Sequence, residues 1–242
     1  MIDLYGMSSP NIRKVVIMLE ELGLAYRSIH VAVFRRAQFD PNFTRISPFG
    51  KVPVIVDRDA DDLAVFESGA ILTYLAETYG DGSLLPAAGP ARYAVLEWLT
   101  AQVAMVGPLL GQNNHFVLLP QEAGSYAARR YAEQSRYIYR VLDQRLAASP
   151  YLAGDAYSIA DVATYPWGLY VPKHGLSWDD YPALKQWCDR IGERPAVIRA
   201  DAEMNAFGAK DHADIVAASS AEIDSFFWRE ETGPAADFSA LT

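Results

Sequence analysis

The chain has 242 residues, of which 51% are hydrophobic and 21% charged. This composition is typical of a soluble globular protein that is large enough to bury a core without disulfides. Its single cysteine, Cys188, excludes an internal disulfide and a cysteine-rich zinc site, and it suits a reducing compartment. The formal net charge of -9 argues against general binding to nucleic acid or to an anionic membrane. The N-terminus does not resemble a signal peptide, so we expect a cytoplasmic protein.

The first eighty residues alternate short apolar runs with amphipathic ones. The short runs predict four strands, over residues 2–5, 29–33, 52–56 and 63–66. Apolar residues at helical spacing predict one helix from Ile12 to a stop near Gly23, and another that includes Ile71 and Tyr79. A strand, a crossover helix and a further strand make a parallel βαβ unit. The order βαβ(α)ββα therefore predicts a small α/β domain.

A connection rich in glycine and proline, residues 80–90, marks the domain boundary. Beyond it, apolar stripes of helical period dominate and no convincing strand signal follows. The expected fold class is therefore an α/β thioredoxin-like domain followed by an all-α domain. The expected divisions are a first domain at 1–80, a linker at 81–90, a helical domain at 91–206 and an acidic, aromatic extension at 207–242.

Three features beyond the linker have structural interpretations. The uncharged stretch from Trp98 to Gln121 is long enough to span a bilayer, but its amides, histidine and prolines favour a helix buried in a protein or dimer. The segment Ser158-Ile-Ala-Asp161 matches a capping box, which fixes the start of a helix. In the extension, Ile223, Phe226 and Phe227 share one helical face, so this turn can dock on an apolar surface.

Four local motifs lie in order on the predicted elements. They are Ser9-Pro10-Asn11, Phe49-Gly-Lys-Val-Pro53, Phe66-Glu-Ser-Gly-Ala-Ile71 and the capping box. Together they resemble the glutathione transferase family over nearly the whole chain to about residue 206. The resemblance implies a thioredoxin-like glutathione-binding domain, a cis peptide bond before Pro53 and a homodimer. The segment from Gln102 to Phe116 is similar to Nu-class bacterial transferases, which include glutathione-dependent disulfide-bond reductases.

Ser9 and Asn11 flank the start of the first predicted helix, where unpaired N–H groups and the helix dipole attract anions. Their donors can surround a thiolate, and a thiol of pKa about 8.5 needs such donors to ionise at neutral pH. The loop has no cysteine, so the sulfur must arrive with the substrate, and glutathione is the obvious carrier. Spacing alone fits simple N-capping equally well. The resemblance favours a catalytic role for Ser9 and Asn11.

Glu67 and Ser68 open a later helix in the same way. Ser68 and the unpaired N–H groups can hold the γ-glutamyl carboxylate of glutathione, while Glu67 takes its ammonium group. Simple capping would explain Ser68 but not Glu67. By resemblance, further residues bind glutathione: Val52 and Pro53 at the cysteinyl moiety, Gln38 and Lys51 at the glycine carboxylate. Gln38 and Lys51 can equally be solvated surface residues.

Arg130 falls where related proteins place an arginine that reaches glutathione in the neighbouring subunit, and Arg129 competes for this role. The helical half should form the hydrophobic substrate site, although large rings also dominate protein cores. The candidates are Tyr165, Trp167, Tyr170 and Phe227. The four histidines and the scattered acids lack metal-binding spacing, so we expect no metal.

We therefore expect a glutathione transferase that activates glutathione, its co-substrate, to a thiolate and directs it at a disulfide or an electrophilic carbon. The same thiolate would serve an ether-cleaving lyase or a peroxidase, and the sequence does not choose among these reactions. The alternative is a non-catalytic binding or regulatory module on the same fold. The plausible glutathione site favours an enzyme. Its expected partners are glutathione, a small substrate and a second copy of the chain, without nucleic acid or membrane.

Overall fold

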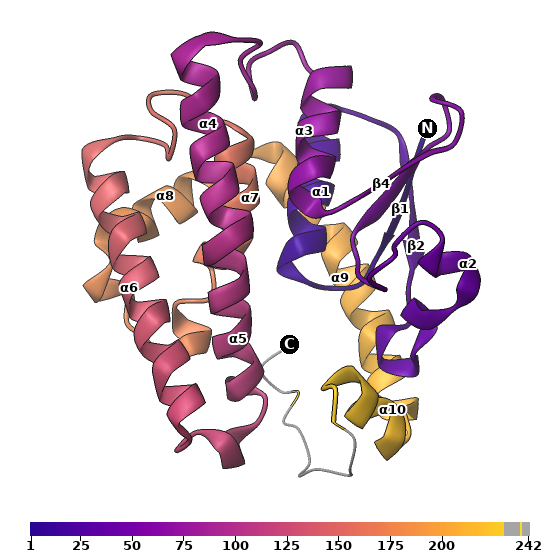
Figure 1. Cartoon of the computed structure of the whole chain (residues 1–242). Coiled ribbons are helices and arrows are strands. Elements are labelled where there is room, and N and C mark those ends of the chain that lie inside the picture. Colours follow the sequence, from indigo (N-terminus) through magenta and orange to yellow (C-terminus); the bar gives the residue numbers. More distant parts are fainter. Residues whose placement is uncertain (230–237, 239–242) are drawn as a thin grey trace. The chain divides into compact units, whose positions relative to one another are not determined.

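The computed structural model describes residues 1–229 and residue 238, and it divides the chain into two compact units. The first unit holds Met1–Leu75 together with the chain from Pro195 to residue 229, and the second holds Ala76–Arg194. This grouping by contact differs from the expected division by chain order into 1–80, 91–206 and 207–242. The reason is that helix α9, Pro195–Ala217, packs against helix α1, Pro10–Glu21. The expected small α/β unit followed by a mostly helical one is confirmed (Figure 1).

The first unit is a four-stranded sheet with helices. Its remaining elements are β1 Ile2–Gly6, β2 Tyr26–His30, η1 Val33–Arg35, η2 Ala37–Phe39, α2 Pro41–Thr44, β3 Val54–Asp57, β4 Leu63–Phe66, α3 Ser68–Tyr79 and α10 Ser220–Phe226. The strand order is β2-β1-β3-β4, with β1 parallel to β2 and antiparallel to β3. The predicted βαβ unit and the predicted hairpin of β3 and β4 are both confirmed.

Two strands differ from their predicted bounds. The prediction of a strand over residues 29–33 is wrong, because β2 begins at Tyr26 and ends at His30. Pairing with β1, from Ile2 opposite Tyr26 to Gly6 opposite His30, determines this strand, and an edge strand does not need an apolar run. The third strand begins at Val54 rather than residue 52, since the preceding proline has no N–H for the ladder.

The core of the first unit lies where α1 meets the sheet. In α1, Ile12 and the run from Val15 to Leu19 are completely buried, as are Leu4 and Ile55 in the neighbouring strands β1 and β3. Helix α9 covers α1 as well. The loop before α1 is also tied to α9, because the N–H of Ser8 donates a 2.7 Å hydrogen bond to the carboxylate of Asp211.

The second unit consists of helices. They are α4 Gly89–Ala101, the π-helical turn η3 Gln102–Val106, α5 Gly107–Val117, η4 Pro120–Glu122, α6 Tyr126–Ala148, α7 Ile159–Gly168, η5 Pro172–His174, η6 Trp178–Asp180 and α8 Pro182–Gly192. Among the described residues, the run Gly89–Val117 is the one helix whose length and composition would suffice to cross a membrane. Core helices pass the same test. Gln102 and Asn113 are buried within the unit, whereas only 33% of the apolar window of this run is buried among the described residues.

The predicted capping box at the start of α7 is confirmed. The buried carboxylate of Asp161 accepts hydrogen bonds from the backbone N–H and hydroxyl of Ser158, the N–H of Leu152 and the indole of Trp187. Burial raises the pKa of Asp161, and these hydrogen bonds oppose the rise. The residue therefore ties α7 to α8 and to the preceding loop, which is a structural role.

Helix α10, Ser220–Phe226, contains the docking turn that the sequence predicts in the extension. Helix α10 packs on η1 of the first unit, where the rings of Phe226 and Phe34 lie 4.6 Å apart. Phe227 is buried. A capping box of Ser219 and Glu222, which the sequence analysis missed, starts this helix. The extension is thus an ordered part of the first unit as far as residue 229.

Candidate functional site

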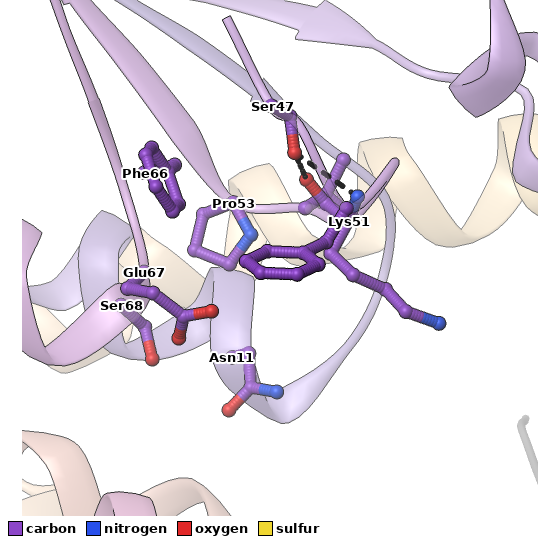
Figure 2. Close-up of a pocket in the computed structure, with 9 residues that line it drawn as sticks. Asn11, Ser47, Lys51, Pro53, Phe66, Glu67 and Ser68 are labelled. Atoms are coloured by element: carbon purple, nitrogen blue, oxygen red, sulfur yellow. Dashed lines mark hydrogen bonds between the residues drawn. The ribbon is translucent and has the colours of Figure 1, made fainter. Parts of the chain in front are cut away.

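A pocket of about 170 Å³ opens in the first unit, at the point where two helices begin and two strands meet (Figure 2). Its lining comes from the first turn of α1, from the loop before β3 and from the junction of β4 and α3. The lining residues are Asn11, Ser47, Phe49, Lys51, Val52, Pro53, Phe66, Glu67 and Ser68. Six of these are predicted site residues. Ser47, Phe49 and Phe66 were not predicted individually.

The start of α1 has the predicted cap. Ser9 has extended backbone geometry, and its hydroxyl oxygen accepts a 3.4 Å hydrogen bond from the N–H of Ile12. A hydroxyl that accepts one hydrogen bond can still donate its own proton. The structure therefore fits both interpretations of Ser9, as a helix cap and as a donor to an anion. Asn11, two residues further, lines the pocket directly.

The start of α3 forms the acidic end of the pocket. Glu67 has a φ of +68°, a left-handed conformation that is rare for a residue with a side chain. Such backbone costs energy and tends to gather at functional sites. Ser68, the first residue of α3, is 7% exposed. Figure 2 shows both side chains on the same side of the pocket as Asn11.

A buried lysine lies behind this end of the pocket. Lys14 in α1 is only 1% exposed, and its ammonium group donates a 3.1 Å hydrogen bond to the hydroxyl of Ser68. Burial lowers the pKa of Lys14 to about 7, while the negative charge of Glu67 opposes this effect. Lys14 belongs to none of the motifs from which the site was predicted. The signal was its place among the apolar residues of α1, because lysine is almost never fully buried unless it is paired.

The loop before β3 is held closed by a serine. Ser47 is buried, and its hydroxyl donates to the carbonyl oxygen of Lys51 at 2.7 Å while accepting from the N–H of Lys51 at 3.0 Å. The bond between Val52 and Pro53 is cis, as the sequence resemblance implied. In Figure 2 the ammonium group of Lys51 points away from the acidic end of the pocket.

Other predicted residues lie outside this lining. Gln38 is buried in η2, and its backbone carbonyl lies next to Gly50 of the loop before β3. Arg130 is exposed on α6 of the second unit, and Arg129 donates to the carbonyl of Gly124.

The aromatic candidates for a substrate site are mostly packed. Tyr165 and Trp167 are buried in α7, and Tyr170 is half-buried after it. Tyr165 contacts Trp187 edge to face, with ring centres 6.2 Å apart. Phe227 belongs to the first unit and is buried there. These positions fit the core interpretation that the sequence left open.

The single cysteine belongs to the second unit and is not among the residues that line the pocket. Cys188 is buried in α8, and burial strongly raises the pKa of its thiol. A buried neutral thiol is a packing residue rather than a nucleophile. Within the described residues, no group of three or more His, Cys, Asp or Glu side chains is arranged to hold a metal ion.

The chain resembles proteins of known family. The glutathione S-transferase N-terminal domain family matches residues 4–83, and the C-terminal domain family matches residues 106–195. The chain is 45% identical over 204 residues to the disulfide-bond oxidoreductase YfcG of Escherichia coli, covering 83% of this chain and 94% of that protein.

Two solved structures extend this likeness to the fold. A glutathione transferase family member from Pseudomonas fluorescens, with two glutathione molecules bound, has a TM-score of 0.76 at 36% identity, covering 82% of this chain and 91% of that one. A glutathione transferase from Pseudomonas putida, with one glutathione disulfide bound per subunit, has a TM-score of 0.76 at 35% identity, covering 82% and 90%.

Proposed function

The chain belongs to the glutathione S-transferase family, and from this premise we propose that it is an enzyme that uses glutathione to reduce disulfides. The observation that carries the proposal is the acidic end of the pocket. There Glu67, the hydroxyl of Ser68 and the buried ammonium group of Lys14 lie at the N-terminus of α3.

The chemistry of this end matches the γ-glutamyl group of glutathione, which carries one ammonium and one carboxylate. Glu67 offers the countercharge for the ammonium group. Ser68 and the first N–H groups of α3 offer donors for the carboxylate. Lys14 adds a positive charge directly behind Ser68, at 3.1 Å from its hydroxyl oxygen. Charge-assisted hydrogen bonds of this kind are about twice as strong as neutral ones.

The remaining parts of glutathione then extend along the pocket. Val52 and Pro53 would take the cysteinyl moiety, and Lys51 would take the glycine carboxylate, with Gln38 nearby. The start of α1 would receive the sulfur, where Ser9 and Asn11 donate to the thiolate and hold its pKa below the free value of about 8.5. Because Cys188 is buried with a raised pKa, the reactive sulfur comes from glutathione.

The reduction proceeds by thiol–disulfide exchange. The glutathione sulfur bonds to one sulfur of the substrate, the S–S bond breaks, and its electron pair leaves on the other sulfur, which is protonated to a thiol. A second glutathione thiolate attacks the mixed disulfide in the same way. Two glutathione molecules are thus oxidised to glutathione disulfide, and the substrate is reduced to two thiols.

The names of the relatives favour a disulfide over the other electrophiles. YfcG is named a disulfide-bond oxidoreductase, and the Pseudomonas putida protein was solved with glutathione disulfide. We further propose a Nu-class-like, cytoplasmic homodimer without a metal. In such a dimer Arg130, or its neighbour Arg129, would reach the glutathione of the other subunit. Of the four aromatic candidates, the half-buried Tyr170 is the one we propose for contact with an apolar substrate, since Tyr165, Trp167 and Phe227 are buried and fit the core interpretation.

Turnover with a set of substrates tests the proposal. Hydroxyethyl disulfide, a chloronitrobenzene, a hydroperoxide and an aryl ether are each supplied with glutathione, and binding of glutathione is measured by calorimetry. We expect the highest kcat/KM with the disulfide. If the aryl chloride, the hydroperoxide or the ether reacted faster, the proposed activity would be conjugation, peroxide reduction or ether cleavage, respectively, in place of disulfide reduction. Binding without turnover of any substrate would favour a non-catalytic module.

A further inference from the structure

Helix α10 lies outside both matched family regions, the second of which ends at residue 195. It nevertheless packs on the first unit. Arg35 of η1 pairs with Glu222 at 3.0 Å, and the rings of Phe34 and Phe226 lie 4.6 Å apart. Helix α10, which Figure 1 shows near the end of the described chain, therefore has a defined position on η1.

Trp228 follows this helix with two unusual properties. Its φ is +56°, a left-handed conformation for which glycine or asparagine is the usual choice. Its side chain is also 71% exposed. The left-handed backbone itself ends α10 in a Schellman motif, because the N–H of Trp228 donates to the carbonyl oxygen of Ser225 and the N–H of Arg229 donates to that of Asp224. The exposure of the ring is the property that this helix cap does not explain.

The ring of Trp228 nevertheless has two defined contacts. Its centre lies 6.0 Å from that of Phe39, at right angles, and the ammonium group of Lys51 lies 5.6 Å over it. Lys51 lines the pocket, and its ammonium group points away from Glu67 and Ser68 (Figure 2). Through Lys51, the C-terminal segment thus reaches the end of the pocket opposite the acidic one.

An aromatic ring is well suited to orient a lysine that must bind an anion. A carboxylate partner would neutralise Lys51 and occupy its donors. The face of a tryptophan attracts the ammonium group through its quadrupole and leaves the N–H donors available. The contact with the ring also restricts the rotamers of Lys51 before the ligand arrives. Less side-chain entropy is therefore lost when the ligand binds.

We propose that Trp228 is a positioning residue that holds Lys51 in place for the glycine carboxylate of glutathione, so that the C-terminal segment makes the pocket selective for the tripeptide. This inference rests on the proposed function, because it needs glutathione in the pocket. It predicts that the contribution of Trp228 appears only with ligands that carry the glycine residue.

Calorimetry with glutathione and with γ-glutamylcysteine, which lacks the glycine, tests this inference in the full chain. Trp228→Ala should weaken glutathione binding about two- to fivefold, the range expected for a solvent-exposed cation–π contact, and leave γ-glutamylcysteine binding unchanged. Trp228→Phe should retain most of the affinity, because it keeps a ring. In a Lys51→Met background, Trp228→Ala should have no further effect. Tyr93→Ala in α4, a similarly exposed aromatic residue, is the matched control.

The outcomes separate the two proposals. Equal loss of affinity for both peptides, or no loss for either, would overturn the positioning role of Trp228 while leaving glutathione binding intact. A further loss of glutathione affinity when Trp228→Ala is added to Lys51→Met would also overturn the positioning role. If the unmodified protein bound neither peptide, the proposed function would fail, and this inference with it.

Discussion

Replacement of the buried lysine of α1, as Lys14→Met, is expected to stabilise the protein and at the same time weaken glutathione binding. The pKa of Lys14 falls from 10.5 to about 7 because the ammonium group is buried. At about 1.36 kcal/mol per pH unit, the charged form costs the folded state roughly 5 kcal/mol. Methionine has similar length and no charge to bury, so the variant avoids this cost.

The stability that Lys14→Met gains over the parent depends on pH. Between pH 7 and 10.5 the unfolded chain holds a proton on Lys14 that the folded chain has lost, so the free energy of unfolding rises with pH. The cost is therefore complete below pH 7 and disappears as the pH approaches 10.5. The advantage of Lys14→Met should be several kcal/mol at pH 6, up to about 5, and should shrink to about 2 at pH 9.

Chemical unfolding of both proteins at pH 6 and pH 9 measures this difference, and calorimetry at pH 6 measures binding. Loss of the positive charge behind Ser68 should weaken glutathione binding by roughly ten- to a hundredfold, the effect of a charge-assisted hydrogen bond of about 1.5–3 kcal/mol. Lys185→Met is the control, because Lys185 forms an exposed pair with Asp189 and should change stability by at most about 1 kcal/mol. A Lys14→Met variant that is less stable than the parent at pH 6, or that binds glutathione equally well, would refute the reasoning.

Four further variants test the γ-glutamyl site, the source of the reactive sulfur and the loop before α1. Glu67→Gln and Ser68→Ala should each raise the KM for glutathione more than they lower kcat, by about 1.5–3 kcal/mol in kcat/KM, and unchanged glutathione binding by calorimetry would argue against the γ-glutamyl site. Cys188→Ser should keep most of the turnover, so a folded but inactive variant would mean that the protein uses its own sulfur. Asp211→Ala removes a carboxylate, 4% exposed, that accepts a 2.7 Å hydrogen bond from the N–H of Ser8. Thermal unfolding should show a loss of about 1–3 kcal/mol, and kcat/KM should fall with it if this contact holds the loop before α1.

The sequence was informative wherever local chemistry decides the structure. The capping box at Ser158 and Asp161 could be predicted because its hydrogen bonds join residues close in the chain. The apolar stripe of α1 and the hairpin of β3 and β4 were equally readable. Most of the pocket followed from two helix starts and one proline loop, whose residues the motifs contain.

Features that depend on distant contacts were not predictable in the same way. The bounds of β2 follow from its pairing with β1, not from its own apolar residues. The contact of Lys14 with Ser68 joins residues that are 54 positions apart. Trp228 meets Lys51 only because α10 folds back on η1, and no periodicity in the sequence indicates where a terminal helix will pack.

The central claim is that the start of α1 turns the thiol of bound glutathione into a thiolate. Titration of the thiolate absorbance of glutathione bound to the protein measures this directly, in the parent and in the double variant Ser9→Ala, Asn11→Ala. The account predicts a midpoint clearly below the free value of about 8.5 in the parent, and a rise of about one to two pH units toward that value in the double variant. The single variants should show smaller shifts. An unchanged midpoint in the double variant would mean that these residues only cap the helix and that the thiolate is stabilised elsewhere.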